Sequence, residues 1–284
     1  MKSYCQARES SYFVAFMKHL GVQRPAFSAK SLRYLRRTPL VYYNGTDADI
    51  SPRKRKCLRS MRYLSIAMDG PVGAGKSTIA DAVAARLHIL HLDTGAMYRA
   101  CGLSCLRSAV PPDDEAAVVS HIAGITVEAA FSERGQRTLL NGEDVSDVIR
   151  TEQISMAASK ISGYAAVRRQ MVSLQQAMAA TRSMLVDGRD ICRVVLPDAQ
   201  VKIFLTASPE ERARRRYEQL LKKGTRVSYE QVLVALKQRD AQDMSRAVDP
   251  LCPTEDAVII DSTGRSFEET VEEILALVRR VYHE

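Results

Sequence analysis

The sequence predicts an α/β fold in which helices flank both faces of a parallel sheet. Three observations support this prediction. Short, continuous apolar runs such as 64–68 and 201–205 are typical of strands buried on both faces. Longer helical stretches separate these runs, as expected where crossover helices join parallel strands. A glycine-rich loop at 70–75 joins the first run to a helix, which is the connection found at phosphate sites.

The first elements alternate between strand and helix. The apolar run 64–68 is the first expected strand, and the Ala-rich segment 76–87 is a helix because alanine favours that conformation. The short run 88–92 is the second strand, with a histidine near each end that we expect at the core edge or the surface. The turn 93–95 then caps a helix from about 96 to 107, which the prolines after it break.

A small insertion with β structure is expected at 115–150. The segments 125–129 and 137–140 alternate or are rich in β-branched residues, and a turn at 133–135 separates them. This pattern predicts a hairpin. Helices are expected to follow it at 151–159 and 165–181.

The second half of the chain returns to buried strands, first at 183–187 and then at 201–205. A helix begins at 208–210 because a serine cap, a proline in the first turn and an acidic residue all suit a helix N-terminus. The remaining expected elements are a helix at 228–244, a strand at 258–261 and a closing amphipathic helix at 267–281.

The loop after the first strand predicts a P-loop NTPase-type core. Its residues match the pattern GxxxxGK[ST], in which glycines let backbone N–H groups converge on phosphate oxygens at a helix N-terminus. The lysine supplies a charge for the β- and γ-phosphates, and the serine hydroxyl is placed to ligate Mg²⁺. No Asn-Lys-x-Asp run follows, which disfavours a guanine-specific GTPase. The predicted nucleotide-binding residues are Gly70, Pro71, Val72, Gly73, Ala74, Gly75, Lys76, Ser77 and Thr78.

Charged residues near the ends of other elements suggest phosphoryl transfer. Asp187 ends a buried strand and is placed to hold Mg²⁺ or its waters, with a turn-capping aspartate as the alternative. Guanidinium forks suit the spread anionic charge of the transition state. No general base is evident, which favours a nucleoside monophosphate, already an oxyanion, over an alcohol as acceptor. The arginines concerned are Arg99, Arg168, Arg189, Arg239 and Arg246, and on one helix Arg212, Arg215 and Arg216, whereas Arg214 is expected on a solvated face.

Charge and composition separate residues 1–60 from the remainder. The first 60 residues hold 13 Lys and Arg against 3 Asp and Glu, whereas 61–284 hold 28 against 30. Nucleic-acid binding by the near-neutral folded part is therefore not expected. We expect 1–60 to be a basic extension that is disordered or dispensable; a nucleic-acid-binding arm, an organellar presequence and sequence upstream of a start at Met61 are the alternatives.

Cysteine spacing and hydropathy bear on the compartment. The cysteines show no CxxC spacing and no ligand cluster with histidine, so reduced thiols in a cytoplasmic protein are expected. No apolar stretch approaches the roughly 20 residues that span a bilayer, so no membrane partner is expected.

Several motifs, taken in order, resemble those of bacterial cytidylate kinases. They are 69–78, 92–99, 187–190, 197–199, 201–205, 239–240 and 261–263. The resemblance runs from about Met61 to residue 284, and implies transfer of the γ-phosphoryl group of ATP to CMP or dCMP with Mg²⁺. It also implies a monomer with a monophosphate-binding insertion at about 94–180, containing a small β structure, and a helical lid at about 208–245.

The resemblance also implies roles for individual residues. Arg99, Arg189 and Arg246 would hold the acceptor phosphate, and Arg239 and Asp243 would contact the ribose. Ser159, Arg168 and Asp190 would recognise the cytosine edge, with Thr94 nearby. Arg212, Arg215 and Arg216 would lie in or beside the lid. The implied catalytic set is Lys76, Arg99, Arg189, Arg246, Arg212 and Arg216, and the implied Mg²⁺ ligands are Ser77 and Asp187.

Two departures from the family pattern concern the base site. Thr94 stands where serine is common, and Ile191-Cys192-Arg193 replaces the usual Ile-Gly-Thr, which leaves Arg193 without an assigned role. Two alternative functions stay open. One is a P-loop kinase for another small acceptor. The other is a nucleotide-dependent nucleic-acid-binding protein that uses the basic arm, although the intact Lys76, Ser77 and Asp187 weigh against it.

Overall fold

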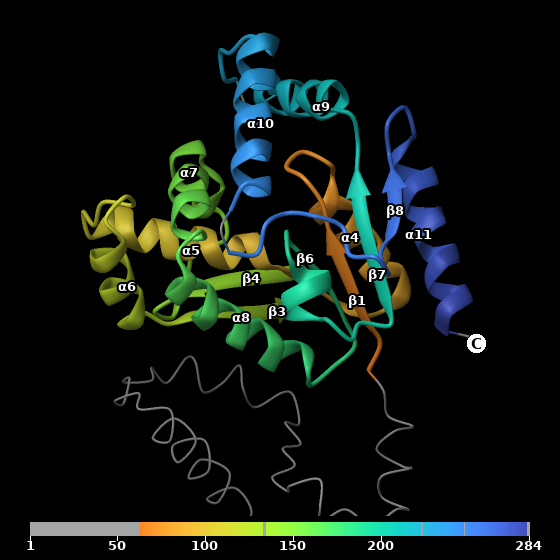
Figure 1. The fold of residues 1–284 in the computed structure, drawn as a ribbon, viewed down its shortest axis with the longest axis horizontal. Helices are drawn as coiled ribbons and strands as arrows, with labels where there is room; N and C mark the ends of the chain where they lie inside the picture. The colour runs from red at the N-terminus through yellow and green to blue at the C-terminus, as the bar shows by residue number, and fades with distance from the viewer. Residues whose placement is uncertain (1–62, 133–134, 223, 247, 283–284) are drawn as a thin grey trace, which may run out of the picture. The chain divides into compact units, whose positions relative to one another are not determined.

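The computed structural model describes residues 63–132, 135–222, 224–246 and 248–282, so the expectations for 1–60 lie outside the described residues. Within this part of the chain, a five-stranded parallel sheet has the order β2-β6-β1-β7-β8 (Figure 1). The predicted α/β fold is confirmed. The strands are β1 (Ser65–Asp69), β2 (Leu90–Asp93), β6 (Met184–Asp187), β7 (Val201–Thr206) and β8 (Val258–Asp261).

The central strand β1 explains the continuous apolar runs in the sequence. It pairs with β6 on one side and β7 on the other, with Ala67 opposite Val186 and Lys202. Ile66 and Met68 are fully buried on one face of the sheet, and Ala67 is fully buried on the other. Because a strand between two helical layers has no solvated face, both sets of alternating side chains are apolar.

Helices form the two covering layers. On one face α4 (Lys76–Leu87) and α11 (Phe267–Tyr282) supply a core that includes Val83 and Ile274. On the other face α5 (Thr94–Arg107) and α8 (Ala165–Ala179) supply a second core. Helix α5 begins two residues earlier than predicted, because the Asp93 carboxylate caps it by accepting from the Ala96 N–H at 2.9 Å.

The expected hairpin is confirmed as β3 (Val127–Ser132) and β4 (Gly135–Leu140), which pair antiparallel. The short strand β5 (Glu143–Asp144) follows and pairs with the other edge of β4. Helix α6 (Glu115–Ala123) was not predicted. The segment before it contains two prolines that suggest only a break, but Asp114 then accepts from the Ala117 N–H and starts a new helix. Helix α7 (Glu152–Ile161) follows a short 3₁₀ turn, η3 (Val148–Arg150).

Two helices lie beyond the arrowhead of β7 in Figure 1: α9 (Pro209–Lys222) and α10 (Tyr229–Met244). They share a small core of Ala213, Val232 and Leu236. A π-helical turn, η4 (Ile191–Val195), follows β6 and was not anticipated. Among the residues described, no helix combines the length and apolar character needed to cross a membrane.

Candidate active site

The loop between β1 and α4 lies at the end of the sheet, above β1 in Figure 1. Gly70 has a φ of 149°, and a Cβ there would lie 1.9 Å from the backbone oxygen of Leu205 in β7. Gly75 caps α4 with a φ of 88°. Both positions therefore require glycine. The chain passes close against the sheet and turns directly into α4, whose first N–H groups have no partner within the helix.

Lys76, the first residue of α4, is a buried cation. Its Nζ donates to the carbonyl oxygens of Gly70 at 2.6 Å and Pro71 at 2.8 Å. Burial, and then the positive charge of Arg189, lower the pKa of Lys76 to about 7, although nearby carboxylates oppose the shift. An ammonium group buried in this way gains strongly from a negatively charged partner such as a phosphate.

Ser77 and Asp187 come together at the junction of α4 and β6. The Ser77 hydroxyl donates to Asp187 Oδ2 at 2.9 Å, and Asp187 Oδ1 lies 2.8 Å from Nε2 of His91. The other ring nitrogen of His91 lies 2.6 Å from Asp81 on α4. Burial lowers the pKa of His91, but the two carboxylates outweigh it and raise the pKa to about 10. Hydroxyl and carboxylate oxygens are the ligands that Mg²⁺ prefers, so this pair fits the predicted metal site.

The junction of β2 and α5 brings Thr94 against Asp187 and pairs Asp93 with Arg99. The Thr94 hydroxyl donates to the Asp187 carbonyl at 2.8 Å, and Asp93 Oδ2 pairs with Arg99 Nη2 at 2.8 Å. Burial raises the pKa of Asp93, but Arg99 and its other partners outweigh burial and hold that pKa below its ordinary value. Arg99 Nε is buried and has no hydrogen-bond partner within the described residues.

Three predicted arginines share one carboxylate. Asp243 on α10 is almost fully buried, with Oδ2 3.0 Å from Arg189 Nε and Oδ1 2.5 Å from Arg246 Nη2. Burial and the charge of Arg189 lower the pKa of Arg239 to about 10, and its buried Nε has no partner in the described part of the chain. Three guanidinium groups around one carboxylate leave an excess of positive charge, which favours an anion.

A second buried pair lies where α8 meets the turn after β6. Arg168 forms an ion pair with Asp190, and its Nη1 donates to the carbonyl oxygen of Ser162 at 3.2 Å. Burial raises the pKa of Asp190 to about 6, although Arg168 opposes the shift. The Ser162 hydroxyl donates to the carbonyl of Ser159 at 2.9 Å, which places the end of α7 next to this pair. The structure therefore gathers the predicted base-recognition residues in one region.

Asp69 holds the turn that carries Asp190. Its two carboxylate oxygens accept from the backbone N–H groups of Ile191 and Cys192, each at 2.8 Å. Burial raises the pKa of Asp69 although these bonds oppose it. The Cys192 side chain is buried against the carbonyls of β1 and β7. The replacement of the usual glycine by cysteine is therefore accommodated inside the core.

Arg212 contacts the phosphate loop directly. It is buried, its Nε donates to the Ala207 carbonyl at 2.8 Å, and its Nη1 donates to Val72 in the loop at 3.0 Å. The same Nη1 pairs with Asp240 on α10 at 2.6 Å. Arg212 thus joins α9, α10 and the phosphate loop.

The other arginines of α9 face elsewhere. Arg214 pairs with glutamates of its own helix on an exposed surface, as expected. Arg215 donates to the Ser262 carbonyl at 2.8 Å, so it faces the segment after β8 and not the phosphate loop. Arg216 pairs with Glu152 of α7 at 2.9 Å, which links α9 to the insertion.

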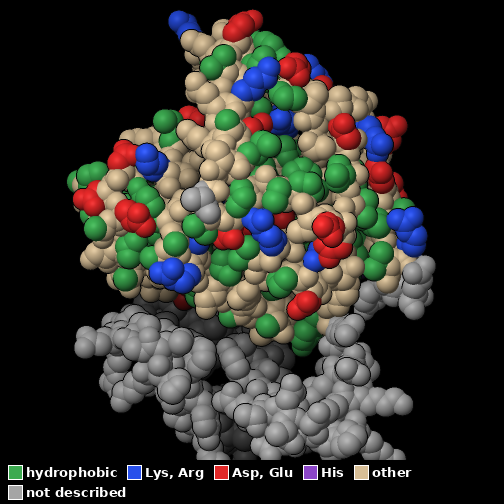
Figure 2. Space-filling view, in the orientation of Figure 1, with side chains coloured by type: hydrophobic (Ala, Val, Ile, Leu, Met, Phe, Trp, Pro, Cys, Tyr) green, Lys and Arg blue, Asp and Glu red, His purple; other side chains and the backbone are tan. Residues whose placement is uncertain are grey.

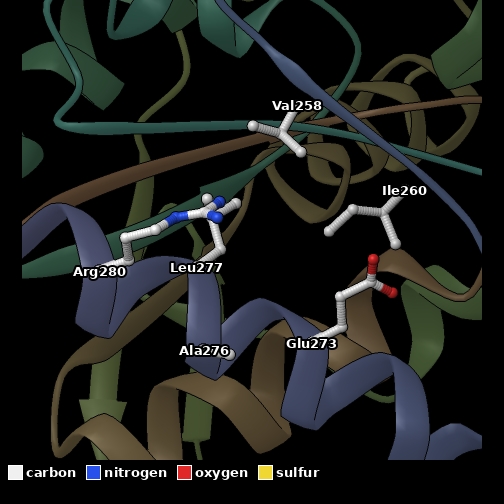
Figure 3. Close-up of a pocket in the computed structure, with 6 residues that line it drawn as sticks. All are labelled: Val258, Ile260, Glu273, Ala276, Leu277 and Arg280. Atoms are coloured by element: carbon white, nitrogen blue, oxygen red, sulfur yellow. The ribbon is translucent and has the colours of Figure 1, made fainter.

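Charge distribution and one hollow describe other parts of the surface. Figure 2 shows acidic and basic side chains interspersed over the face in view, consistent with the near-neutral charge of residues 61–284. A hollow of about 380 Å³ lies between β8 and α11, with Val258 and Ile260 on its apolar side and Glu273 and Arg280 near its ends (Figure 3). None of the predicted site residues lines this hollow.

Four residues of this region had no assigned role from sequence. His91 contacts Asp187, and Ser162 accepts hydrogen bonds from Arg168 and Arg246. Asp249 contacts Arg168, and Arg193 donates to the backbone carbonyl of Pro250. Apart from the contact between Ser162 and Arg168, which spans six residues, these contacts join residues more than 50 positions apart, so no local pattern indicates them. The one available signal was the departure from the family pattern at residue 193.

Comparison with known proteins bears on this arrangement. The sequence model of the cytidylate kinase family matches residues 66–280. The chain is 44% identical to the cytidylate kinase of Caldicellulosiruptor bescii over 78% of its own length and 98% of that protein. It is 46% identical to the cytidylate kinase of Caldanaerobacter subterraneus subsp. tengcongensis and 44% identical to that of Pasteurella multocida, in each case over 76% of the chain and 95% of the relative.

Proposed function

Because this chain belongs to the cytidylate kinase family, we propose that it transfers the γ-phosphoryl group of ATP to CMP or dCMP, giving ADP and CDP or dCDP. One observation carries the proposal. Ser77 of the phosphate loop donates to Asp187 at 2.9 Å, and Arg189, two residues further along, contacts Asp243 in the arginine cluster at 3.0 Å, so the phosphate loop and the arginine cluster adjoin. Such a site can hold two phosphate-bearing molecules with their phosphates adjacent.

On the ATP side, residues 70–78 bind the triphosphate through backbone N–H groups, and Lys76 exchanges its two carbonyl partners for phosphate oxygens. The 2.9 Å contact between Ser77 and Asp187 supports these two residues as the groups that hold Mg²⁺. When bound, the metal ion neutralises charge on the β- and γ-phosphates.

On the acceptor side, Arg99, Arg189 and Arg246 hold the monophosphate. The excess of guanidinium groups around Asp243 supports this assignment, because an incoming phosphate supplies the missing negative charge. The acceptor oxygen needs no general base, since a phosphate monoester is already an oxyanion at neutral pH. Arg239, whose buried Nε has no partner among the described residues, and Asp243 then contact the ribose.

The base is recognised by Asp190 and Arg168, with Ser159 and Thr94 beside them. Cytosine presents an amine where uracil presents a carbonyl. The Asp190 carboxylate accepts a hydrogen bond from the amine and repels the carbonyl. A polar pocket of this kind rejects the wrong base by roughly 10⁴-fold, because the wrong base leaves a buried polar group unpaired.

Arg212 and Arg216 supply charge to the transferring group. Contact with Val72 places Arg212 beside the phosphate loop, and Arg216 lies on the same helix, α9. Guanidinium groups at this position stabilise the charge that spreads over the γ-phosphoryl oxygens. The phosphate loop, the arginine cluster and the base pocket come from one chain, which supports a monomer. Cys101, Cys105 and Cys192 are buried and form no disulfide within the described part of the chain, which supports a cytoplasmic location.

The proposal is tested by ADP release from the full chain with ATP, Mg²⁺ and a panel of CMP, dCMP, UMP and AMP. We expect CMP and dCMP to be phosphorylated with much higher kcat/KM than UMP or AMP. No turnover of CMP with ample ATP and Mg²⁺ would overturn the proposal. Preferred turnover of another acceptor would instead support a P-loop kinase of different specificity.

A further inference from the structure

Arg168 contacts two carboxylates at once. Its side chain is 4% exposed, its Nη2 faces Asp190 Oδ2, and its Nε lies 2.9 Å from Oδ2 of Asp249. With Nη1 on the Ser162 carbonyl, every nitrogen of the guanidinium group has a partner. The second carboxylate, Asp249, therefore determines the orientation of the arginine as much as Asp190 does.

Asp249 is itself held in place. It lies in the segment that follows α10, with a φ of 50° that aspartate tolerates better than most residues. The Leu251 N–H donates to the Asp243 carbonyl at 2.9 Å. Arg193 donates through Nη2 to the carbonyl of the next residue, Pro250, at 3.1 Å.

We propose that Asp249, held by Arg193, is a positioning residue for recognition of the acceptor base. Asp249 occupies the Nε edge of Arg168, so that only one nitrogen of the arginine, Nη2, contacts one oxygen of Asp190, Oδ2. The inference rests on the proposed function, in which Arg168 and Asp190 recognise cytosine, and it gives Arg193 the role that the sequence left open.

The geometry explains why a second carboxylate is needed. A guanidinium group with a single carboxylate partner tends to form a bidentate pair, in which two of its nitrogens each donate to a different carboxylate oxygen. That arrangement would occupy both oxygens of Asp190 and compete with the cytosine amine. With Nε committed to Asp249, Oδ1 of Asp190 is left for the amine. The two carboxylates also outnumber the one guanidinium group between them, which favours an amine over a carbonyl even with Arg246 nearby.

The test measures steady-state kinetics and melting temperature for the full chain and the variants Asp249→Ala and Asp249→Asn. We expect Asp249→Ala to raise the KM for CMP about tenfold and to reduce the preference for CMP over UMP, because a buried donor loses its partner. The KM for ATP stays within about twofold, since no ATP contact changes. Asp249→Asn keeps an acceptor for Nε and holds the KM for CMP within about threefold of the wild type.

Two further variants make the test specific. Arg193→Ala raises the KM for CMP in the same direction, and adding it to Asp249→Ala changes the KM by less than about twofold, because the two act through one contact. Asp256→Ala is the matched control. It breaks an ion pair with Lys202 in which Asp256 is largely exposed, so we expect no kinetic change.

The outcomes separate this inference from the function on which it rests. A wild-type chain that leaves CMP unphosphorylated overturns both. A CMP-active wild type together with a folded Asp249→Ala of unchanged KM for CMP overturns the inference alone. The inference alone is also overturned if Asp249→Asn raises the KM for CMP as much as Asp249→Ala does, because asparagine retains a hydrogen-bond acceptor for Nε. If Asp249→Ala does not fold, the Asp249→Asn and Arg193→Ala results decide by the same criteria.

Discussion

The hydroxyl oxygen of Ser77 lies 2.9 Å from Oδ2 of Asp187, although 110 residues separate them in the chain. The contact exists because β6 lies next to β1, which leads into the phosphate loop. The carboxyl ends of parallel strands meet at one edge of the sheet. Loop residues after β1, β2 and β6 therefore converge there, and the predictions below follow from that convergence.

Replacing Ser77 by alanine removes one oxygen from this pair. We expect the Mg²⁺ concentration needed for half-maximal activity to rise about tenfold, the lower end of the effect of disturbing a metal site. Activity measured across a Mg²⁺ titration checks this. Ser155→Ala is the control, since Ser155 lies on α7 and its hydroxyl donates to the carbonyl of Thr151, the residue that caps this helix. An unchanged Mg²⁺ requirement in Ser77→Ala would contradict the assignment.

Lys76→Met should change catalysis and stability in opposite directions. We expect kcat to fall by about 10²–10³-fold, the usual loss when a charge that stabilises the transition state is removed. The melting temperature at pH 7 should rise, because the variant has no amine that must either be buried with its charge or lose its proton on folding.

The pH dependence of that gain in stability has a defined sign. The pKa of Lys76 is about 7 in the folded protein and near 10.5 when unfolded, so the unfolded chain binds the extra proton between these values. Wild-type stability therefore rises with pH across this window, and the advantage of Lys76→Met shrinks. Chemical unfolding at pH 7 and pH 9.5 measures it; a constant or growing advantage would contradict the prediction.

Two arginines of α9 provide a matched comparison. Arg212→Ala leaves Asp240 without its buried partner, so we expect a loss of about 3 kcal/mol in the free energy of unfolding. It also removes the contact with Val72, and kcat should fall. Arg214→Ala breaks only the surface pairs of this arginine and should change stability far less than Arg212→Ala. Equal effects of the two substitutions on unfolding in denaturant would refute this distinction.

Local patterns and distant contacts differ in how far sequence predicts them. The strands and the phosphate loop could be predicted from contiguous residues. Burial on two faces requires an unbroken apolar run in each strand, and the φ of 88° at Gly75 requires glycine in the loop. The pairing of Arg168 with Asp249 could not be predicted, since 81 residues separate them. Pro250 indicates a turn at Asp249, but a local turn signal does not identify the partner of the Asp249 side chain. The same holds for His91, whose position at the core edge was expected but whose carboxylate partners come from α4 and β6.

Asp190→Ala tests the proposed base recognition directly. We expect the variant to lose most of its preference for CMP over UMP, which in the wild type is roughly 10⁴-fold for a site of this kind. The loss should come mainly from weaker CMP turnover, with UMP turnover unchanged or improved. Measured kcat/KM for both nucleotides gives the ratio. A ratio equal to that of the wild type would show that another group recognises the amine.

The same carboxylate predicts how the preference changes with pH. Burial raises the pKa of Asp190 to about 6, so the group is ionised at pH 8 and largely protonated at pH 5. The ionised form accepts from the cytosine amine, whereas the protonated form can donate to the uracil carbonyl. The ratio of kcat/KM for CMP over UMP should therefore fall as pH decreases through 6. Titration of the acceptor phosphate, whose second pKa is also near ~6, is common to both nucleotides and cancels in the ratio. In Asp190→Ala the ratio should be flat with pH, and a slope that persists in that variant would place the titrating group elsewhere.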